Sequence, residues 1–179
     1  TGLVIPNVFG PFGNPYYNSV VATFSHQLTH NEKPKIDLDG RLKLIYVGEL
    51  INEIYRVILD AKGCPELKLD YTSEIKVSEL LEKLNSYKDQ YLNNGAIPEL
   101  NTTFEKNLFN TYRSYIDYKS FFPYNLKQHV DDRGTFVEII RTLSSGQVSS
   151  STTKPGLTRG NHFHTRKIER FTVITGKAL

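Results

Sequence analysis

The chain of 179 residues contains no methionine and a single cysteine, Cys64. One thiol excludes an internal disulfide, which fits a reducing compartment. No apolar run approaches the roughly 18 residues of a membrane span, and no charged segment followed by an apolar one opens the chain as a signal peptide. We therefore expect a cytoplasmic protein that has no membrane partner.

The chain also has little net charge. Its formal charge is only +3, with 23% charged and 39% hydrophobic residues, and this balance is typical of a globular protein. The slight basic excess is too small to predict binding to nucleic acid or to a membrane surface. The apolar start "TGLVIPNVFG", without an initiator methionine, predicts either a piece of a longer protein or a sequence with omitted residues.

Helical periodicity dominates the first two thirds of the chain. Four segments carry apolar residues at helical spacing: 18–31, 47–63, 77–92 and 102–116. Gly63 is expected as the residue that ends the second helix, and Ser78 as the N-cap of the third. Short strand-like segments lie between the helices, at 2–5, 34–37 and 43–47. These alternating elements predict an α/β portion over residues 1–118.

Alternation of apolar and polar residues replaces the helical period after residue 130. Four such segments are separated by glycines, at 134–143, 146–153, 156–164 and 169–176. We read residues 119–128 as a linker and residues 129–179 as the start of an all-β unit. The predicted fold is thus α/β followed by all-β.

Two histidines stand out in the segment "GLTRGNHFHTRKIERFTVITG". His162 and His164 share one face if the backbone is extended, and Glu169 follows five residues later. Two imidazoles and a carboxylate supply three ligands for zinc or another first-row metal. Neutral imidazole, with a pKa of about 6.5, equally suits a catalytic base. A third possibility is a polar barrel wall in which Glu169 pairs with Arg166 or Arg170.

The first portion resembles a known enzyme family. "IPNVFGPFG", a helix and then "PKIDLDGRLKLIYVGELINEIYRVI" are similar to the substrate-binding half of extended short-chain dehydrogenases of the Rossmann type that act on nucleotide sugars. This resemblance implies that Asn7 faces the sugar diphosphate and that Asn18 approaches the nucleotide base. It also implies that the backbone of Ile5 and Pro6 lies near the nicotinamide of the cofactor.

The sequence departs from this family at the diphosphate. Leu42 stands where many members have an arginine, so Arg41 or Lys43 is expected to supply the positive charge. The family's cofactor fingerprint and its catalytic Ser or Thr, Tyr and Lys would precede Thr1. The resemblance therefore implies NADPH as a cofactor whose binding motif is not in this chain.

The second portion resembles two related groups of barrel proteins. The spacing from Gly156 through the histidines to Gly176 matches the first motif of cupins, which are jelly-roll β-barrels, and implies His162, His164 and Glu169 as metal ligands. "DDRGTFVEI" and "GQVSSSTTKPGLTRGNHFH" are similar to dTDP-4-keto-6-deoxysugar 3,5-epimerases. That similarity makes His162 the base. The residues that it places on the nucleotide diphosphate are Arg133, Glu138 and Arg159.

Taken in order, the two portions resemble the bifunctional capsular polysaccharide biosynthesis proteins of the UDP-N-acetyl-L-fucosamine route. That family implies a zinc-containing cupin that epimerises C3 of a UDP-4-keto-6-deoxy-N-acetylhexosamine. A reductase then reduces the 4-keto group with NADPH, towards UDP-2-acetamido-2,6-dideoxy-L-talose. We expect a homodimer, because a partner subunit could cover exposed strand edges. The alternative is a non-catalytic fragment or sugar-nucleotide-binding remnant with incomplete active sites.

Overall fold

The computed structural model describes residues 2–60, 66–144 and 146–177. The chain forms two compact units. Unit 1 comprises Thr1–Asn125 and Ile140–Val148, and unit 2 comprises Leu126–Ile139 and Ser149–Leu179. The division that we predict at a linker of residues 119–128 stays a prediction.

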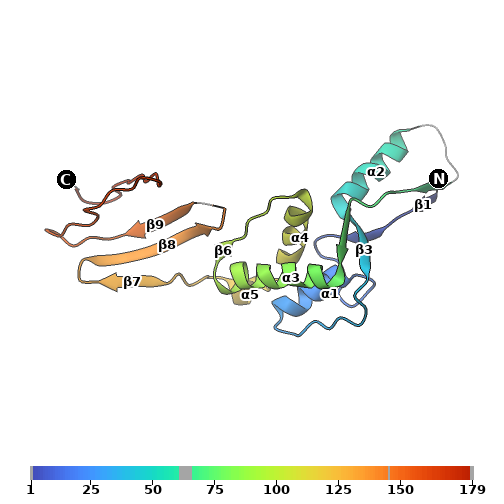
Figure 1. The fold of residues 1–179 in the computed structure, drawn as a ribbon, viewed down its shortest axis with the longest axis horizontal. Helices are drawn as coiled ribbons and strands as arrows, with labels where there is room; N and C mark the ends of the chain where they lie inside the picture. Colours follow the sequence, from blue (N-terminus) through green and yellow to red (C-terminus); the bar gives the residue numbers. More distant parts are fainter. Residues whose placement is uncertain (1, 61–65, 145, 178–179) are drawn as a thin grey trace. The chain divides into compact units, whose positions relative to one another are not determined.

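Two small sheets lie in unit 1 (Figure 1). In the first, β3 (Arg41–Tyr46) is the central strand, parallel to β2 (Asn7–Phe9) and antiparallel to β5 (Ser73–Lys76). In the second, β1 (Gly2–Val4) runs parallel to β4 (Glu66–Lys68). The predicted strands at 2–5 and 43–47 are therefore confirmed.

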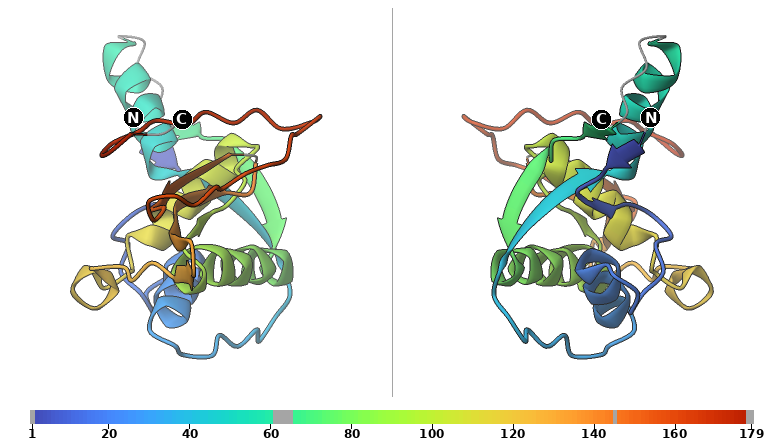
Figure 2. Two further views of the ribbon diagram at one scale, coloured as in Figure 1. Left: turned by 90° about the vertical axis from the view of Figure 1, so that its left-hand side faces the viewer. Right: turned by 90° about the vertical axis from the view of Figure 1, so that its right-hand side faces the viewer.

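Three helices of unit 1 build its main core: α1 (Val20–Thr29), α3 (Val77–Tyr87) and α4 (Thr103–Arg113). Figure 2 shows them gathered beside the sheet that contains β3. Their apolar faces meet at side chains that are almost completely buried, namely Val21, Phe24, Leu44, Leu80, Leu84, Leu108 and Tyr112. The helical period in the sequence thus marks the buried faces.

The remaining elements of unit 1 are short, apart from one helix. The longest helix is α2 (Val47–Leu59), which follows β3 directly. A π-helical turn, η1 (Lys88–Asn93), continues α3, and α5 (Tyr118–Phe121) follows α4. The two-residue strand β6 (Ala96–Ile97) pairs in parallel with Arg141 and Thr142.

Local side-chain chemistry sets the helix ends. Ser19 caps α1 by accepting a hydrogen bond from the Ala22 amide at 3.2 Å, and Thr102 caps α4 through the Glu105 amide at 3.1 Å. The prediction of Ser78 as a cap is wrong. Helix α3 begins at Val77 with Lys76 at the N-cap position, and the amide and hydroxyl of Ser78 both donate to Asp39.

Two further sequence predictions need comment. The strand expected at 34–37 is wrong: this segment has no regular structure, since Pro34 offers no backbone donor and Lys35 pairs with Asp37 in solvent. Helix α2 ends at Leu59, and Gly63 lies outside the described residues. All four predicted helices are nevertheless present, with ends that differ by a few residues.

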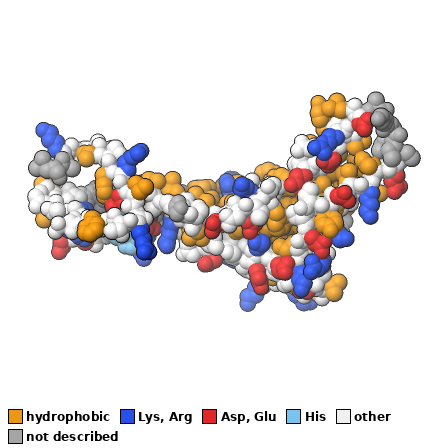
Figure 3. Space-filling model, turned by 45° about the horizontal axis from the view of Figure 1, so that its top comes forward, with side chains coloured by type: hydrophobic (Ala, Val, Ile, Leu, Met, Phe, Trp, Pro, Cys, Tyr) orange, Lys and Arg blue, Asp and Glu red, His pale blue; other side chains and the backbone are white. Residues whose placement is uncertain are grey.

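Helix α2 carries two apolar rows. Leu50 and Ile54 face a small core with Ile45 and Leu69. The second row is exposed and consists of Ile51, Tyr55, Ile58 and Leu59, whose exposed fractions run from 58% to 70%. Hydrophobic side chains are visible over this helix in Figure 3. Only one side of α2 is therefore buried in the described part of the chain.

Unit 2 is built around an antiparallel ribbon. Strand β8 (Gly134–Thr142) pairs with β7 (Gln128–Asp131), and β9 (Gln147–Ser151) also pairs with β8. The predicted strands at 134–143 and 146–153 are thus confirmed. Those predicted at 156–164 and 169–176 are wrong, since none of the described residues after Ser151 forms a regular strand. The backbone of this segment pairs with the ribbon only near Thr152 and Lys154.

The described part of unit 2 therefore shows a three-stranded ribbon and not a closed barrel. Among all described residues, no helix combines the length and the hydrophobicity that crossing a membrane requires.

Two tyrosines of the unit 1 core form a matched pair for a stability test. The Tyr112 hydroxyl is buried without a hydrogen-bond partner among the described residues, whereas the Tyr115 hydroxyl donates to the Gly13 carbonyl at 2.7 Å. Burial raises the pKa of both hydroxyls. Because an unsatisfied buried hydroxyl is costly, Tyr112→Phe should leave the free energy of unfolding unchanged or raise it. Tyr115→Phe should lower it by about 1 kcal/mol.

Urea unfolding of the two variants measures this difference. A clear loss of stability in Tyr112→Phe, equal to that in Tyr115→Phe, would show that the Tyr112 hydroxyl is satisfied in solution.

Candidate functional site

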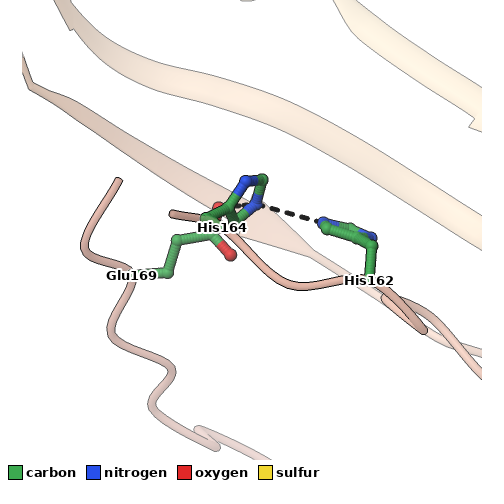
Figure 4. A group of neighbouring side chains, drawn as sticks. All are labelled: His162, His164 and Glu169. Carbon is green, nitrogen blue, oxygen red and sulfur yellow. Dashed lines mark hydrogen bonds and ion pairs between the residues drawn. The ribbon is translucent and has the colours of Figure 1, made fainter. Parts of the chain in front are cut away.

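The two histidines and the glutamate singled out in the sequence come together in unit 2 (Figure 4). The Nε2 atoms of His162 and His164 lie 3.1 Å apart, and His164 Nε2 lies 3.4 Å from Glu169 Oε1. The three candidate ligand atoms all lie within 4.8 Å of one another. Left-handed backbone at Gly160 and Asn161, with φ of +93° and +54°, breaks the extended run just before His162.

The hydrogen bonds of His162 fix its tautomer. Its Nδ1 lies 2.9 Å from the Gly160 carbonyl oxygen, which can only accept. In the neutral imidazole Nδ1 therefore carries the proton and Nε2 carries the lone pair. His164 must then donate through its own Nε2 in the contact between the two rings. His162 Nε2 thus carries the basic lone pair, which accepts from His164 in this structure.

Glu169 is held by positive neighbours. The Lys167 ammonium donates to its Oε1, and this hydrogen bond, together with the charge of Lys167, holds the pKa of Glu169 below its usual range. Glu169 is therefore a charged carboxylate beside His164. The predicted pairing of Glu169 with Arg166 or Arg170 is wrong, because Lys167 takes that place.

A second cluster surrounds Asp131 at the turn between β7 and β8. Its Oδ2 accepts from Arg133 Nε at 3.0 Å and from Arg133 Nη2 at 2.6 Å. Its Oδ1 accepts from Arg159 Nη2 at 3.2 Å and from the amides of Arg133 and Gly134 at 2.9 and 3.1 Å. The Arg133 hydrogen bonds lead the causes that lower the pKa of Asp131. One carboxylate thus binds two of the arginines predicted to contact a diphosphate.

A pocket of about 210 Å³ in unit 1 contains the two predicted asparagines. Asn7 lies on β2 opposite Leu44 of β3, and Leu42 is two residues away on the same face. Asn18 adopts a left-handed φ of +52° just before α1, next to the cap residue Ser19. Residues from two strands and a helix start therefore line one cavity, which includes Leu42 and both asparagines.

The other predicted site residues lie elsewhere in their units. Ile5 and Pro6 connect β1 to β2, where Ile5 is 41% exposed. Arg41 does not line the pocket, since its Nη1 binds Glu74 Oε1 at 3.1 Å on β5. Glu138 is half-buried on β8.

Residues 129–179 match the family model of the polysaccharide biosynthesis C-terminal domain. A curated relative from Pseudomonas aeruginosa, UDP-2-acetamido-2,6-beta-L-arabino-hexul-4-ose reductase, is 35% identical over 177 residues, covering 97% of this chain and 47% of its own.

Solved structures agree with this match. The capsular polysaccharide assembling protein CapF from Staphylococcus aureus is 37% identical, with a TM-score of 0.74 over 90% of this chain and 44% of its own. A second CapF structure, with the inhibitor 3-isopropenyl-tropolone, has a TM-score of 0.75 over 90% and 47% of the two chains. This chain is homologous to part of CapF. It spans about half the length of these relatives.

The mixed α/β fold of the chain matches part of CapF, and its last 51 residues belong to the matched C-terminal domain region. Our sequence reasoning on this CapF homologue did not single out Asp131 or Lys167. The signal for Asp131 was available, since an aspartate two residues before Arg133 and three before Gly134 is typical of a turn in which its side chain caps backbone amides. The signal for Lys167 was absent, because any of three nearby cations could pair with Glu169.

Proposed function

We propose that this chain is part of a nucleotide-sugar enzyme of capsular or surface polysaccharide biosynthesis. In this proposal unit 2 begins a cupin domain that epimerises C3 of a UDP-4-keto-6-deoxy-N-acetylhexosamine. Unit 1 is the substrate lobe of a short-chain dehydrogenase that reduces the 4-keto group with NADPH, giving UDP-2-acetamido-2,6-dideoxy-L-talose. The observation that carries the epimerase role is the 2.9 Å contact between His162 Nδ1 and the Gly160 carbonyl, which leaves Nε2 as a base.

The chemistry needs one well-placed base. The 4-keto group acidifies the neighbouring C3–H, so the His162 Nε2 lone pair can take that proton while the C–H electron pair moves towards the keto oxygen as an enolate. A proton from solvent water, added to the opposite face of C3, gives the epimer, and His162 releases the proton that it took to solvent. Arg133 and Arg159 are well suited to a substrate diphosphate, because planar guanidinium groups bind phosphate oxygens in pairs.

A divalent metal is the rival role for the histidines. The donor set fits zinc: the two Nε2 atoms are 3.1 Å apart, a spacing that bonds of about 2.0–2.1 Å from one ion can span, and Glu169 is charged. Bound there, the ion would act as a Lewis acid towards a carbonyl oxygen. His162, His164 and Glu169 would hold it, with Lys167 displaced from the carboxylate. A His162 Nε2 that binds metal has no lone pair for C3–H, so the two roles exclude each other.

The reductase part of the proposal rests on the pocket in unit 1. Asn7 and Asn18 offer amide donors and acceptors to a polar ligand at the edge of the parallel strands β2 and β3, next to the start of α1. The backbone of Ile5 and Pro6 is the part of this chain assigned to the nicotinamide of NADPH.

One experiment tests both activities. The intact protein is incubated with the UDP-4-keto sugar in D₂O, first without and then with NADPH. We expect deuterium at C3 in both cases and oxidation of NADPH in the second. A folded protein that leaves C3 fully protonated contradicts the epimerase role, and one that leaves NADPH unchanged contradicts the reductase role.

The contribution of the two pocket asparagines to substrate binding can be tested by substitution. Asn7→Ala and Asn18→Ala should each raise the KM of the reduction about fivefold to thirtyfold, because each removes hydrogen bonds to a polar substrate. Asn52→Ala, on exposed α2, is the matched control and should leave KM unchanged. Steady-state kinetics at saturating NADPH measures these values. An effect on kcat alone would place the asparagines outside substrate binding.

The alternative that we keep is a sugar-nucleotide-binding remnant without catalysis. The chain spans 44% to 47% of the length of the relatives. The intact mass of the purified protein decides between them: a mass near 20.5 kDa supports the remnant, and a much larger one supports the enzyme. Light scattering on the same sample tests the predicted homodimer.

A further inference from the structure

We propose that Asp131 is a positioning residue, which holds the guanidinium groups of Arg133 and Arg159 in place for the diphosphate of the nucleotide sugar. This inference rests on the proposed function and extends it to a residue with no contact to the reacting atoms. It is motivated by the five hydrogen bonds that the carboxylate of Asp131 accepts, three of them from the two guanidinium groups.

The geometry leaves suitable donors free. Arg133 uses Nε and Nη2 on Asp131, and Arg159 uses Nη2. In the described part of the chain the Nη1 groups of both arginines make no hydrogen bond. The side chain of Arg159 is only 23% exposed, and its Nε is buried without a hydrogen-bond partner among the described residues. A buried guanidinium donor without an acceptor is costly, and a phosphate oxygen would satisfy it.

Backbone hydrogen bonds hold the cluster in addition to the two turn amides that donate to Asp131. The Thr152 amide donates to the Thr135 carbonyl at 2.9 Å, and the Lys154 amide donates to the Arg133 carbonyl at 2.8 Å. These bonds attach the segment that leads to Arg159 to the turn that carries Arg133. Besides accepting from two backbone amides of the turn, Asp131 therefore holds two flexible side chains.

Electrostatics alone predicts the opposite effect of Asp131. A carboxylate beside a phosphate site repels the anion. If the positions of the arginine side chains did not depend on Asp131, removal of its charge would therefore tighten the binding of the diphosphate. If Asp131 acts by holding the arginines, replacing its charged carboxylate by an amide should weaken binding, because the Arg133 guanidinium loses both of its hydrogen bonds and Arg159 keeps only one to a neutral oxygen. The direction of the change in diphosphate affinity thus distinguishes a positioning role of Asp131 from a purely electrostatic one.

Asp131→Asn is the decisive variant. Its amide oxygen, in the place of Oδ1, still accepts from the Arg133 and Gly134 amides and from Arg159 Nη2, but its NH₂ group, in the place of Oδ2, cannot accept from the Arg133 guanidinium. Asp132→Asn, the next residue, makes the same charge change at an exposed side chain and is the matched control. We expect titration calorimetry with UDP to give a Kd about tenfold higher for Asp131→Asn than for wild type, and an unchanged or slightly lower Kd for Asp132→Asn.

Three further measurements make the test specific to a positioning role. The C3 exchange reaction should show a raised KM with a nearly unchanged kcat in Asp131→Asn, since His162 is untouched. Arg133→Gln should weaken UDP binding similarly, and the double variant should lose much less than the sum of the two effects, because Asp131→Asn acts through the Arg133 guanidinium. The thermal midpoint of Asp131→Asn should match that of wild type.

The outcomes separate the inference from the proposed function. If wild type and Arg133→Gln behave as expected but Asp131→Asn binds UDP as well as wild type or better, only the positioning role is wrong. If wild type binds no UDP and exchanges no C3 hydrogen, the proposed function and this inference both fail. Should Asp131→Asn unfold, the Nε–H resonances of Arg133 and Arg159 in wild type decide: slow hydrogen exchange without UDP supports positioning, and fast exchange overturns it.

Discussion

His162→Asn should reduce deuterium incorporation at C3 by at least about 100-fold, because removal of a general base costs a factor of this order or more. Asn has a similar size and can still donate to the Gly160 carbonyl, but it has no basic lone pair. NADPH-dependent reduction of a sugar supplied with the correct C3 configuration should continue, since that step belongs to the other activity. Nuclear magnetic resonance of the product in D₂O measures the exchange rate.

Two matched variants decide how His162 acts. His129→Asn changes an exposed histidine on β7 and should leave exchange unchanged. If His162 is the base, His164→Asn should keep part of the exchange activity, because His162 Nε2 retains its lone pair. If His162 is a metal ligand, His162→Asn, His164→Asn and a chelator should all abolish exchange and reduce bound zinc together. That second pattern would contradict the base assignment.

The helices could be predicted from the sequence because their apolar residues repeat over three turns. The stripe that includes Phe104, Leu108 and Tyr112 packs into the main core, as the period requires. Helix starts were less predictable. Ser78 has a good capping side chain, yet Asp39, which is 39 residues away in the chain, takes its amide and hydroxyl. A contact of this range has no local signal in the sequence.

The residues of the candidate metal or base site could be predicted from the sequence, but the conformation of their backbone could not. The spacing of His162 and His164 indicated that the rings would meet, and they do, although the predicted strand is wrong. A strand requires a partner for its backbone, and composition does not reveal whether one is available. The positions of Asn7 and Asn18 in one pocket could not be predicted from physics alone either, since the loop between them is shaped by tertiary contacts. Resemblance to nucleotide-sugar enzymes supplied that pairing.

Gly134→Ala should produce the largest loss of order in unit 2. Gly134 has a φ of +145°, and a Cβ built there would lie 2.2 Å from the Thr152 carbonyl oxygen. The side chain would therefore meet both backbone strain and a clash with backbone that cannot move without breaking the Thr152–Thr135 hydrogen bond. We expect a loss of about 2–4 kcal/mol from overpacking and strain together.

Gly146→Ala separates the two causes, because Gly146 has a similar φ of +138° but its nearest contact is Thr142 Oγ1 at 3.4 Å. It should cost only the strain, about 1–2 kcal/mol. Hydrogen exchange at the Thr152 and Lys154 amides is the sharpest measurement, since both donate to the β7–β8 region. Protection should fall strongly in Gly134→Ala and stay near wild type in Gly146→Ala. Equal protection in the two variants would mean that Thr152 moves freely, and that the segment leading to Arg159 and His162 is not held by this turn.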